Sequence, residues 1–207
     1  MKRLAAIVLA AGRSQRMGAF KPLLPFGEST VIESCLANLL ASGVRELVVV
    51  LGHRAGEVQA HLAGWPVKVA LNAESHSEMG VSIARGVELL PDDIAATLIT
   101  PVDLPAVPPS AIRAVIETWQ QGHARLVIPE YEGRGGHPVL LSLDFRAELL
   151  HLYAQRGLRG LFERHSEEVR RAPVASPHIR RDMDTWKDYC ALHEEICGIP
   201  PPSNAGS

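Results

Sequence analysis

The amino-acid composition of the chain changes abruptly after residue 11, from apolar to glycine-rich and cationic. Residues 4–11 form an unbroken apolar run, which is typical of a strand buried on both faces of a parallel sheet. Two glycines, two arginines and a lysine follow within ten positions: Gly12, Arg13, Arg16, Gly18 and Lys21. Small residues let backbone N–H groups approach phosphate oxygens, and the cationic side chains neutralise phosphate charge. The stretch therefore predicts a strand that empties into a loop able to wrap a triphosphate.

Two common phosphate-binding motifs do not fit this loop. A Walker loop needs a glycine, four residues and then Gly-Lys-Ser/Thr, whereas Gly12 and Gly18 are too far apart and Ala19 follows. A dinucleotide fingerprint needs Gly-x-Gly-x-x-Gly running straight into a helix. Residue 14 is Ser, and prolines from Pro22 on oppose an immediate long helix. The sequence thus argues against a nicotinamide-dependent oxidoreductase.

Net charge, cysteine content and the length of apolar runs limit the partners and the cellular compartment that we expect. The 207 residues carry a net charge of −2, so no general basic field points to nucleic acid. Cys35, Cys190 and Cys197 are sparse and lack CxxC spacing, which favours reduced thiols. The first eleven residues imitate a secretory signal, but cleavage there would delete the first strand. No apolar run is long enough to span a membrane, and we expect a cytoplasmic protein.

A second chemical centre follows the apolar segment 94–100. Asp103 stands between Pro101 and Pro105, so its carboxylate is held on a stiff turn. A carboxylate at the end of a buried strand can bind Mg²⁺, which takes one or two carboxylates together with phosphate oxygens and water. The alternative is that Asp103 merely caps the next helix. Because Ser110 lies nearer to that helix, we favour metal binding.

Five further residues are candidates with open alternatives. Ligands of open α/β sheets bind at the carboxyl ends of strands. His53 follows the expected strand 46–51 and could bind a ligand there, or it could equally lie in a solvated loop without a role. Gly80 and Ser82 begin a helix whose free N–H groups could contact a nucleotide, or Ser82 is an ordinary cap. His137 could be a loop histidine without a role. Asp184 could simply cap the final helix.

Strands and helices alternate along the whole chain, which implies a largely parallel sheet in one domain. We expect the domain to cover residues 1–197 and the Pro-, Gly- and Ser-rich residues 198–207 to be disordered. The expected strands are residues 4–11, 46–51, 67–71, 94–100, 125–129, 139–141 and 168–174, with a hairpin at 131–136. The expected helices are residues 29–41, 55–62, a helix from 80, 110–121, 143–151, 157–165 and 188–197.

The N-terminal loop also resembles a known family. Leu9-Ala10-Ala11-Gly12, Arg16-Met17-Gly18 and Lys21 resemble the signature of the MobA-like NTP transferases, and within them the molybdenum cofactor cytidylyltransferase branch. Later segments extend the resemblance to about residue 195. They are Gly80-Val81-Ser82, Asp103-Leu104-Pro105, Gly136-His137-Pro138 and Asp182-Met183-Asp184-Thr185, after which Trp186 and Lys187 depart from the family's Pro and Glu.

The resemblance implies a fold and a set of site residues. The fold would be a single-domain three-layer α/β/α sandwich with a Rossmann-like, mostly parallel sheet. The nucleotide would be bound by Leu9, Ala10, Ala11, Gly12, Arg16, Lys21, Gly80 and Ser82, with Arg16, Lys21 and Asp103 as catalytic residues. Mg²⁺ would be held by Asp103 and Asp184, although the choice between Asp182 and Asp184 stays open. His53 and His137 would face the acceptor.

The reaction implied is transfer of a nucleoside monophosphate from an NTP to a phosphorylated acceptor, with release of pyrophosphate. Ala11 stands where guanylyl-transferring relatives have a second glycine, and Leu23-Leu24-Pro25 resembles the cytidylyl branch. The resemblance therefore favours CTP and molybdopterin, with an apo-molybdoenzyme or its chaperone as a possible protein partner. Guanylyl transfer, another phosphorylated acceptor and a non-catalytic nucleotide-binding or cofactor-binding chaperone remain alternatives.

Overall fold

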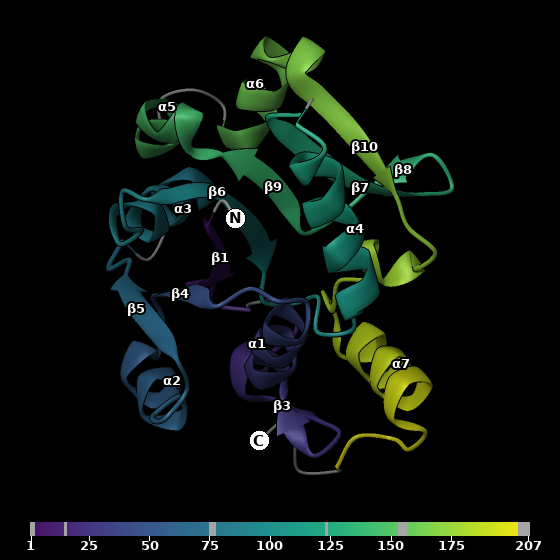
Figure 1. Cartoon of the computed structure of the whole chain (residues 1–207). Coiled ribbons are helices and arrows are strands. Elements are labelled where there is room, and N and C mark those ends of the chain that lie inside the picture. The colour runs from purple at the N-terminus through teal and green to yellow at the C-terminus, as the bar shows by residue number, and fades with distance from the viewer. Residues whose placement is uncertain (1–2, 15, 75–77, 123, 153–156, 203–207) are drawn as a thin grey trace.

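The structure is a computed structural model that describes residues 3–14, 16–74, 78–122, 124–152 and 157–202. A twisted sheet with the strand order β10-β7-β9-β6-β1-β4-β5 forms the centre, and β8 adds to β7 (Figure 1). Its pairs are parallel except those of β9 with β6 and β7 and of β8 with β7. The predicted mostly parallel α/β fold is therefore confirmed.

The strands are β1 (Arg3–Ala10), β2 (Pro25–Phe26), β3 (Ser29–Thr30), β4 (Glu46–Leu51), β5 (Val67–Leu71), β6 (Ile94–Pro101), β7 (Leu126–Tyr131), β8 (Arg134–Gly135), β9 (Val139–Ser142) and β10 (Val169–Pro173). The α-helices are α1 (Val31–Ala41), α2 (Ala55–His61), α3 (Met79–Glu88), α4 (Pro109–Gln120), α5 (Arg146–Leu150), α6 (Gly157–Arg164) and α7 (Trp186–Cys197). Short 3-10 turns are η1 (Lys21–Leu23), η2 (Leu143–Phe145), η4 (Ser166–Glu168) and η5 (Pro177–Arg180).

Strand β1 lies in the middle of the sheet. Ala5, Ala6, Ile7 and Val8 are all fully buried, so successive side chains are covered on both faces. Even-numbered residues of the strand belong to the apolar cluster that includes α1 and α4, and odd-numbered ones to the cluster that includes α3 and α5. Figure 1 shows α3, α5 and α6 on one face and α1, α4 and α7 on the other. These are the three predicted layers.

Several element boundaries differ from those expected. The helix predicted over residues 29–41 begins at Val31, because Thr30 is its N-cap and accepts a hydrogen bond from the Glu33 amide. Residues 29 and 30 instead pair with β2 in a small hairpin that the pattern did not predict. The segment 143–151 divides into η2 and the short α5. The final helix begins at Trp186, where a Thr185–Asp188 capping box fixes its start.

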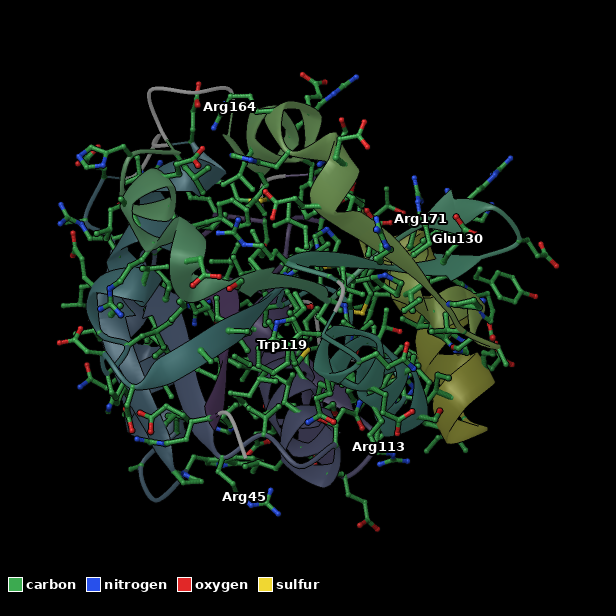
Figure 2. All side chains as sticks on the ribbon, turned by 45° about the horizontal axis from the view of Figure 1, so that its top comes forward. Arg45, Arg113, Trp119, Glu130, Arg164 and Arg171 are labelled. Atoms are coloured by element: carbon green, nitrogen blue, oxygen red, sulfur yellow. The ribbon has the colours of Figure 1, made fainter. Side chains whose placement is uncertain are left out.

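Several arginines of the C-terminal third lie on the surface in ion pairs with glutamates. Figure 2 shows Arg171 beside Glu130, where β10 pairs with β7, and their charged atoms lie 3.3 Å apart. Arg164 makes a similar pair with Glu148. In the described residues no helix has the length and apolar character needed to cross a bilayer. The predicted tail falls partly at residues 203–207, outside the described residues.

Candidate active site

A cavity of about 400 Å³ opens where β1 and β6 end. The two strand ends are joined by a hydrogen bond from the Val102 amide to the Leu9 carbonyl, 3.0 Å long. This is the carboxyl edge of the parallel strands, where open α/β sheets bind ligands. The lining residues are Leu9, Ala10, Gly12, Arg13, Ser14, Arg16, Lys21, Pro22, Pro101, Val102, Asp103 and Asp184.

The glycine-rich loop is shaped by two left-handed residues, Ser14 with a φ of 53° and Gly18 with a φ of 73°. The loop is closed by a hydrogen bond from the Met17 amide to the Ser14 carbonyl. The Ser14 hydroxyl also accepts a hydrogen bond from the Lys21 amide, 3.3 Å away. Met17 itself is buried and anchors the loop to the core. The loop thus presents its cationic side chains to the cavity from a fixed base.

Lys21 is the centre of the site. Its Nζ atom lies 3.1 Å from Asp103 Oδ2 and 3.1 Å from Asp184 Oδ1. Only 8% of the residue is exposed. Lysine is almost never so buried unless it is paired, and here it is paired with two aspartates. Arg16, which is mostly exposed, reaches the other Asp184 oxygen at 2.7 Å. Four predicted residues from three distant segments therefore meet in one ion-pair network.

The two aspartates are positioned through their backbones. The Met183 amide donates to the Asp103 carbonyl at 3.1 Å, which docks the segment holding Asp184 against the turn after β6. Thr185, the next residue, caps α7, so Asp184 precedes the cap and is not itself the capping side chain. The alternative reading of Asp184 as the helix cap is therefore wrong.

Asp182 adds a third carboxylate near this network. Burial raises its pKa, and the neighbouring Asp184 and Asp103 carboxylates raise it further. His137 lies near the same carboxylates. A cis peptide bond joins it to Pro138. Its Nδ1 atom is 3.4 Å from the Ile99 carbonyl, and burial lowers the pKa of the ring. The imidazole is thus held neutral beside a group of carboxylates.

The other predicted residues lie around the described cavity rather than in its lining. Gly80 and Ser82 do begin a helix, α3, but Ser82 is buried and its hydroxyl accepts a hydrogen bond from Asn72 Nδ2 at 2.9 Å. His53 packs edge-to-face on Phe20, with ring centroids 5.8 Å apart. Its amide lies 3.4 Å from the Ala11 carbonyl, to which it donates.

Some contributors were missed in the sequence. Asn72 joins β5 to α3, and its only sequence signal is its place directly after a predicted strand. Ser14 was noted merely as a departure from a glycine motif, yet its hydroxyl and its left-handed backbone shape the loop. Arg13, which was expected only as part of the cationic loop, also lines the cavity.

The donor set fits one divalent cation. Asp103 and Asp184 each direct a carboxylate oxygen at the same point, which the Lys21 ammonium group occupies. Mg²⁺ binds one or two carboxylates together with phosphate oxygens and water. Across the described ranges, no group of three or more His, Cys, Asp or Glu side chains is arranged as a complete metal site. The residues therefore suit a cation that arrives with phosphate ligands better than one caged by protein alone.

The comparisons with known proteins agree with this geometry. The MobA-like NTP transferase domain family matches residues 6–169, and the chain belongs to that family. It is 25% identical to the molybdenum cofactor cytidylyltransferase of Escherichia coli (strain K12), over 96% of this chain and 100% of that protein. It is 29% identical to the nicotine blue oxidoreductase of Paenarthrobacter nicotinovorans, over 68% of this chain and 71% of that protein.

Solved structures share this fold. Rv0371c from Mycobacterium tuberculosis H37Rv superposes with a TM-score of 0.83 at 27% identity, covering 93% of this chain and 98% of that one. The same protein has been solved in complex with manganese, with a TM-score of 0.79 at 26% identity over 93% and 98% of the two chains. The chain is thus a nucleotidyltransferase of the MobA-like family, related to the cofactor cytidylyltransferase.

Proposed function

We propose that this protein transfers the cytidylyl group of CTP to the phosphate of molybdopterin, or of its molybdenum form, and releases pyrophosphate in the cytoplasm. The observation that carries the proposal is the meeting of Lys21, Asp103 and Asp184 at the mouth of a glycine-rich cationic loop. The choice of CTP and of the acceptor is supported by the Escherichia coli relative. An apo-molybdoenzyme or its chaperone would receive the product.

The chemistry needs no side-chain nucleophile. An oxygen of the acceptor's ionised phosphate attacks the α-phosphorus of the nucleotide, while the bond from that phosphorus to the β-phosphate bridging oxygen breaks. The leaving pyrophosphate takes the electron pair of that bond. Catalysis then consists of holding the two phosphates in line and neutralising the charge that develops.

Each part of the network has a role in this scheme. Arg16 and Lys21 bind the β- and γ-phosphates, and the backbone of residues 9–12 contacts the nucleotide. Asp103 and Asp184 hold Mg²⁺, which supplies Lewis-acid polarisation of the α-phosphate when it is bound. Support for a divalent cation comes from the fit of the two carboxylates and from the manganese complex of the similar Rv0371c.

The neighbouring loops suit the acceptor and the base. His53 follows β4 and His137 precedes β9, and both lie beside the carboxyl edge of β1 and β6. We assign them to the acceptor side. Gly80 and Ser82 act by shaping the start of α3 next to Asn72, where free helix N–H groups are available to the nucleotide.

One relative favours a second candidate. The similarity to nicotine blue oxidoreductase keeps open a hydride-transfer function on the same fold. Against it stand the missing Gly-x-Gly-x-x-Gly motif and a cavity built around a lysine with two aspartates. NAD(P)H binding or oxidation by the purified protein would favour this candidate.

The test is pyrophosphate release with Mg²⁺, measured for the four ribonucleotides with and without molybdopterin. We expect release with CTP only when molybdopterin is present. Release with GTP would assign the protein to guanylyl transfer. Nucleotide binding without release across the panel would contradict cytidylyl transfer to molybdopterin and favour another acceptor or a chaperone.

Variants add a control to this assay. Lys21→Ala and Asp103→Asn should abolish release while the circular dichroism spectrum stays that of the wild type. Asp92→Asn, on a fully exposed carboxylate at the opposite end of β6 from Asp103, should leave activity unchanged. An active Asp103→Asn protein would remove the metal assignment.

A further inference from the structure

We propose that Lys21 keeps the metal-binding carboxylates occupied in the free protein and releases them only when a nucleotide draws its ammonium group away. The divalent cation then binds with or after the nucleotide, and not before it. The inference rests on the proposed function in one respect, the assignment of Asp103 and Asp184 as the metal ligands.

The first argument is the geometry of the free site. The Lys21 ammonium lies 3.1 Å from an oxygen of each aspartate, in the position between two carboxylates that a cation would take. Its side chain is only 10% exposed, and its own amide is held by Ser14. Arg16 occupies the second oxygen of Asp184. Both carboxylates are thus already engaged by positively charged side chains.

The second argument is charge. Two carboxylates facing one ammonium and one guanidinium form a neutral group of four. A divalent cation placed on the same oxygens would lie within a few ångströms of the Lys21 ammonium, and like charges at that separation repel strongly at a partly buried site. The ammonium and the divalent cation therefore compete for the aspartates.

The third argument is the number of ligands. Within the described part of the chain, no set of three or more His, Cys, Asp or Glu side chains could hold a metal ion by itself. Two carboxylates fill at most part of the octahedral shell that Mg²⁺ requires. Phosphate oxygens would complete that shell and, in the same step, would offer Lys21 a new anionic partner.

The nucleotide therefore does two things to the site. Its polyphosphate attracts Lys21, whose four-carbon stem lets the ammonium move without a change in the backbone. That movement frees Asp103 and Asp184. Since coupling between two ligands is reciprocal, each should raise the affinity of the protein for the other.

The proposal makes an unusual prediction for Lys21→Met, which keeps the length of the side chain and removes its charge. We expect the variant to bind Mn²⁺ alone about tenfold more tightly than the wild type does, a typical size for such coupling. It should bind CTP more weakly. Free Mn²⁺ is measured by electron paramagnetic resonance in a titration without nucleotide, and CTP binding by calorimetry without metal.

Two controls accompany this variant. Lys68→Met removes a lysine of β5 that is ion-paired with Glu46 of β4, and it should leave both affinities unchanged. Lys21→Met combined with Asp103→Asn should lose the gain in Mn²⁺ affinity. Lys21→Gln serves as a second neutral variant, and all proteins are compared by thermal melting so that a folding defect is recognised.

Several outcomes would overturn the proposal. Mn²⁺ affinity in Lys21→Met that equals or falls below the wild-type value would show that the lysine does not mask the aspartates. A gain that survives Asp103→Asn would place the ion elsewhere. If the wild type binds Mn²⁺ equally well with and without CTP, only the binding order fails; if it binds none even with CTP, the metal assignment in the proposed function fails too.

Discussion

Gly136→Ala tests how the fold holds Asp184 in the site. A Cβ atom at position 136 would lie 2.3 Å from the Ile179 carbonyl oxygen and 2.8 Å from the Ile179 carbonyl carbon. Both obstacles are backbone atoms, so no side-chain rotation relieves the clash. Two hydrogen bonds fix this contact, from the Gly136 amide to Pro129 at 3.0 Å and from the His137 amide to Ile179 at 2.8 Å.

The magnitude follows from these distances. An ordinary contact begins near 3.4 Å, so the η5 segment must move away by about 1 Å, a displacement of the kind that overpacking forces on a core at a cost of about 1–3 kcal/mol. The same movement stretches the His137–Ile179 hydrogen bond beyond its useful length, which adds about 1 kcal/mol. We expect a total loss of about 2–4 kcal/mol in the free energy of unfolding.

The displaced segment leads directly to Asp184, so turnover should fall further than the folded fraction alone explains. Urea unfolding gives the stability, and pyrophosphate release at a temperature where the variant is folded gives the activity. Gly56→Ala is the matched control, because position 56 lies in α2 with no atom within 4 Å of the new Cβ, and there alanine should stabilise by up to about 1 kcal/mol. A Gly136→Ala protein as stable and as active as the wild type would refute the reasoning.

Three other variants test the surroundings of the site. His193→Ala removes a buried ring that accepts from the Gly27 amide at 3.3 Å and whose Nδ1 lies 2.8 Å from the Ile199 carbonyl, and unfolding in urea should show a loss of about 2–4 kcal/mol. Thr185→Ala removes the N-cap of α7 and should cost about 1 kcal/mol by the same measurement. Burial lowers the pKa of His137 below its ordinary 6.5, so the wild type should lose stability as the pH falls below 6.5. His137→Gln should flatten that dependence. A wild-type stability that is constant from pH 7.5 to pH 5 would contradict this prediction.

Much of the fold could be predicted because the signals are local. Residues 46–51 and 67–71 were expected as strands with the bounds that β4 and β5 have, since β-branched runs bounded by turn residues identify a buried strand. The hairpin of β2 and β3 was not predicted. Each of its strands has two residues, too few for any alternation of polar and apolar positions to show.

The residues of the site likewise fall into those that local sequence signals predict and those whose contacts depend on packing. Asp103 and the cationic loop follow apolar strands, and the rule that ligands bind at the carboxyl edge brings them together. Ser82 was expected to contact nucleotide, which stays a prediction, and its hydroxyl accepts a hydrogen bond from Asn72. Sequence cannot reveal such a bond, because it joins the ends of two elements whose relative placement depends on the packing of the whole layer. The burial of Lys21 between two aspartates depends on packing in the same way.

Helix α7 shows why the site needs the end of the chain as much as its beginning. Its N-terminal cap, Thr185, follows Asp184, while Tyr189 and His193 hold the β2–β3 hairpin, which follows the 3-10 turn that begins at Lys21. The Tyr189 hydroxyl donates to the Pro25 carbonyl at 2.7 Å, and burial raises the pKa of Tyr189 to about 12, so this donor keeps its proton at physiological pH. One helix thus fixes both partners of the Lys21–Asp184 ion pair. Backbone carbonyls accept from any donor and leave no mark in the sequence, so this coupling becomes visible only in the folded chain.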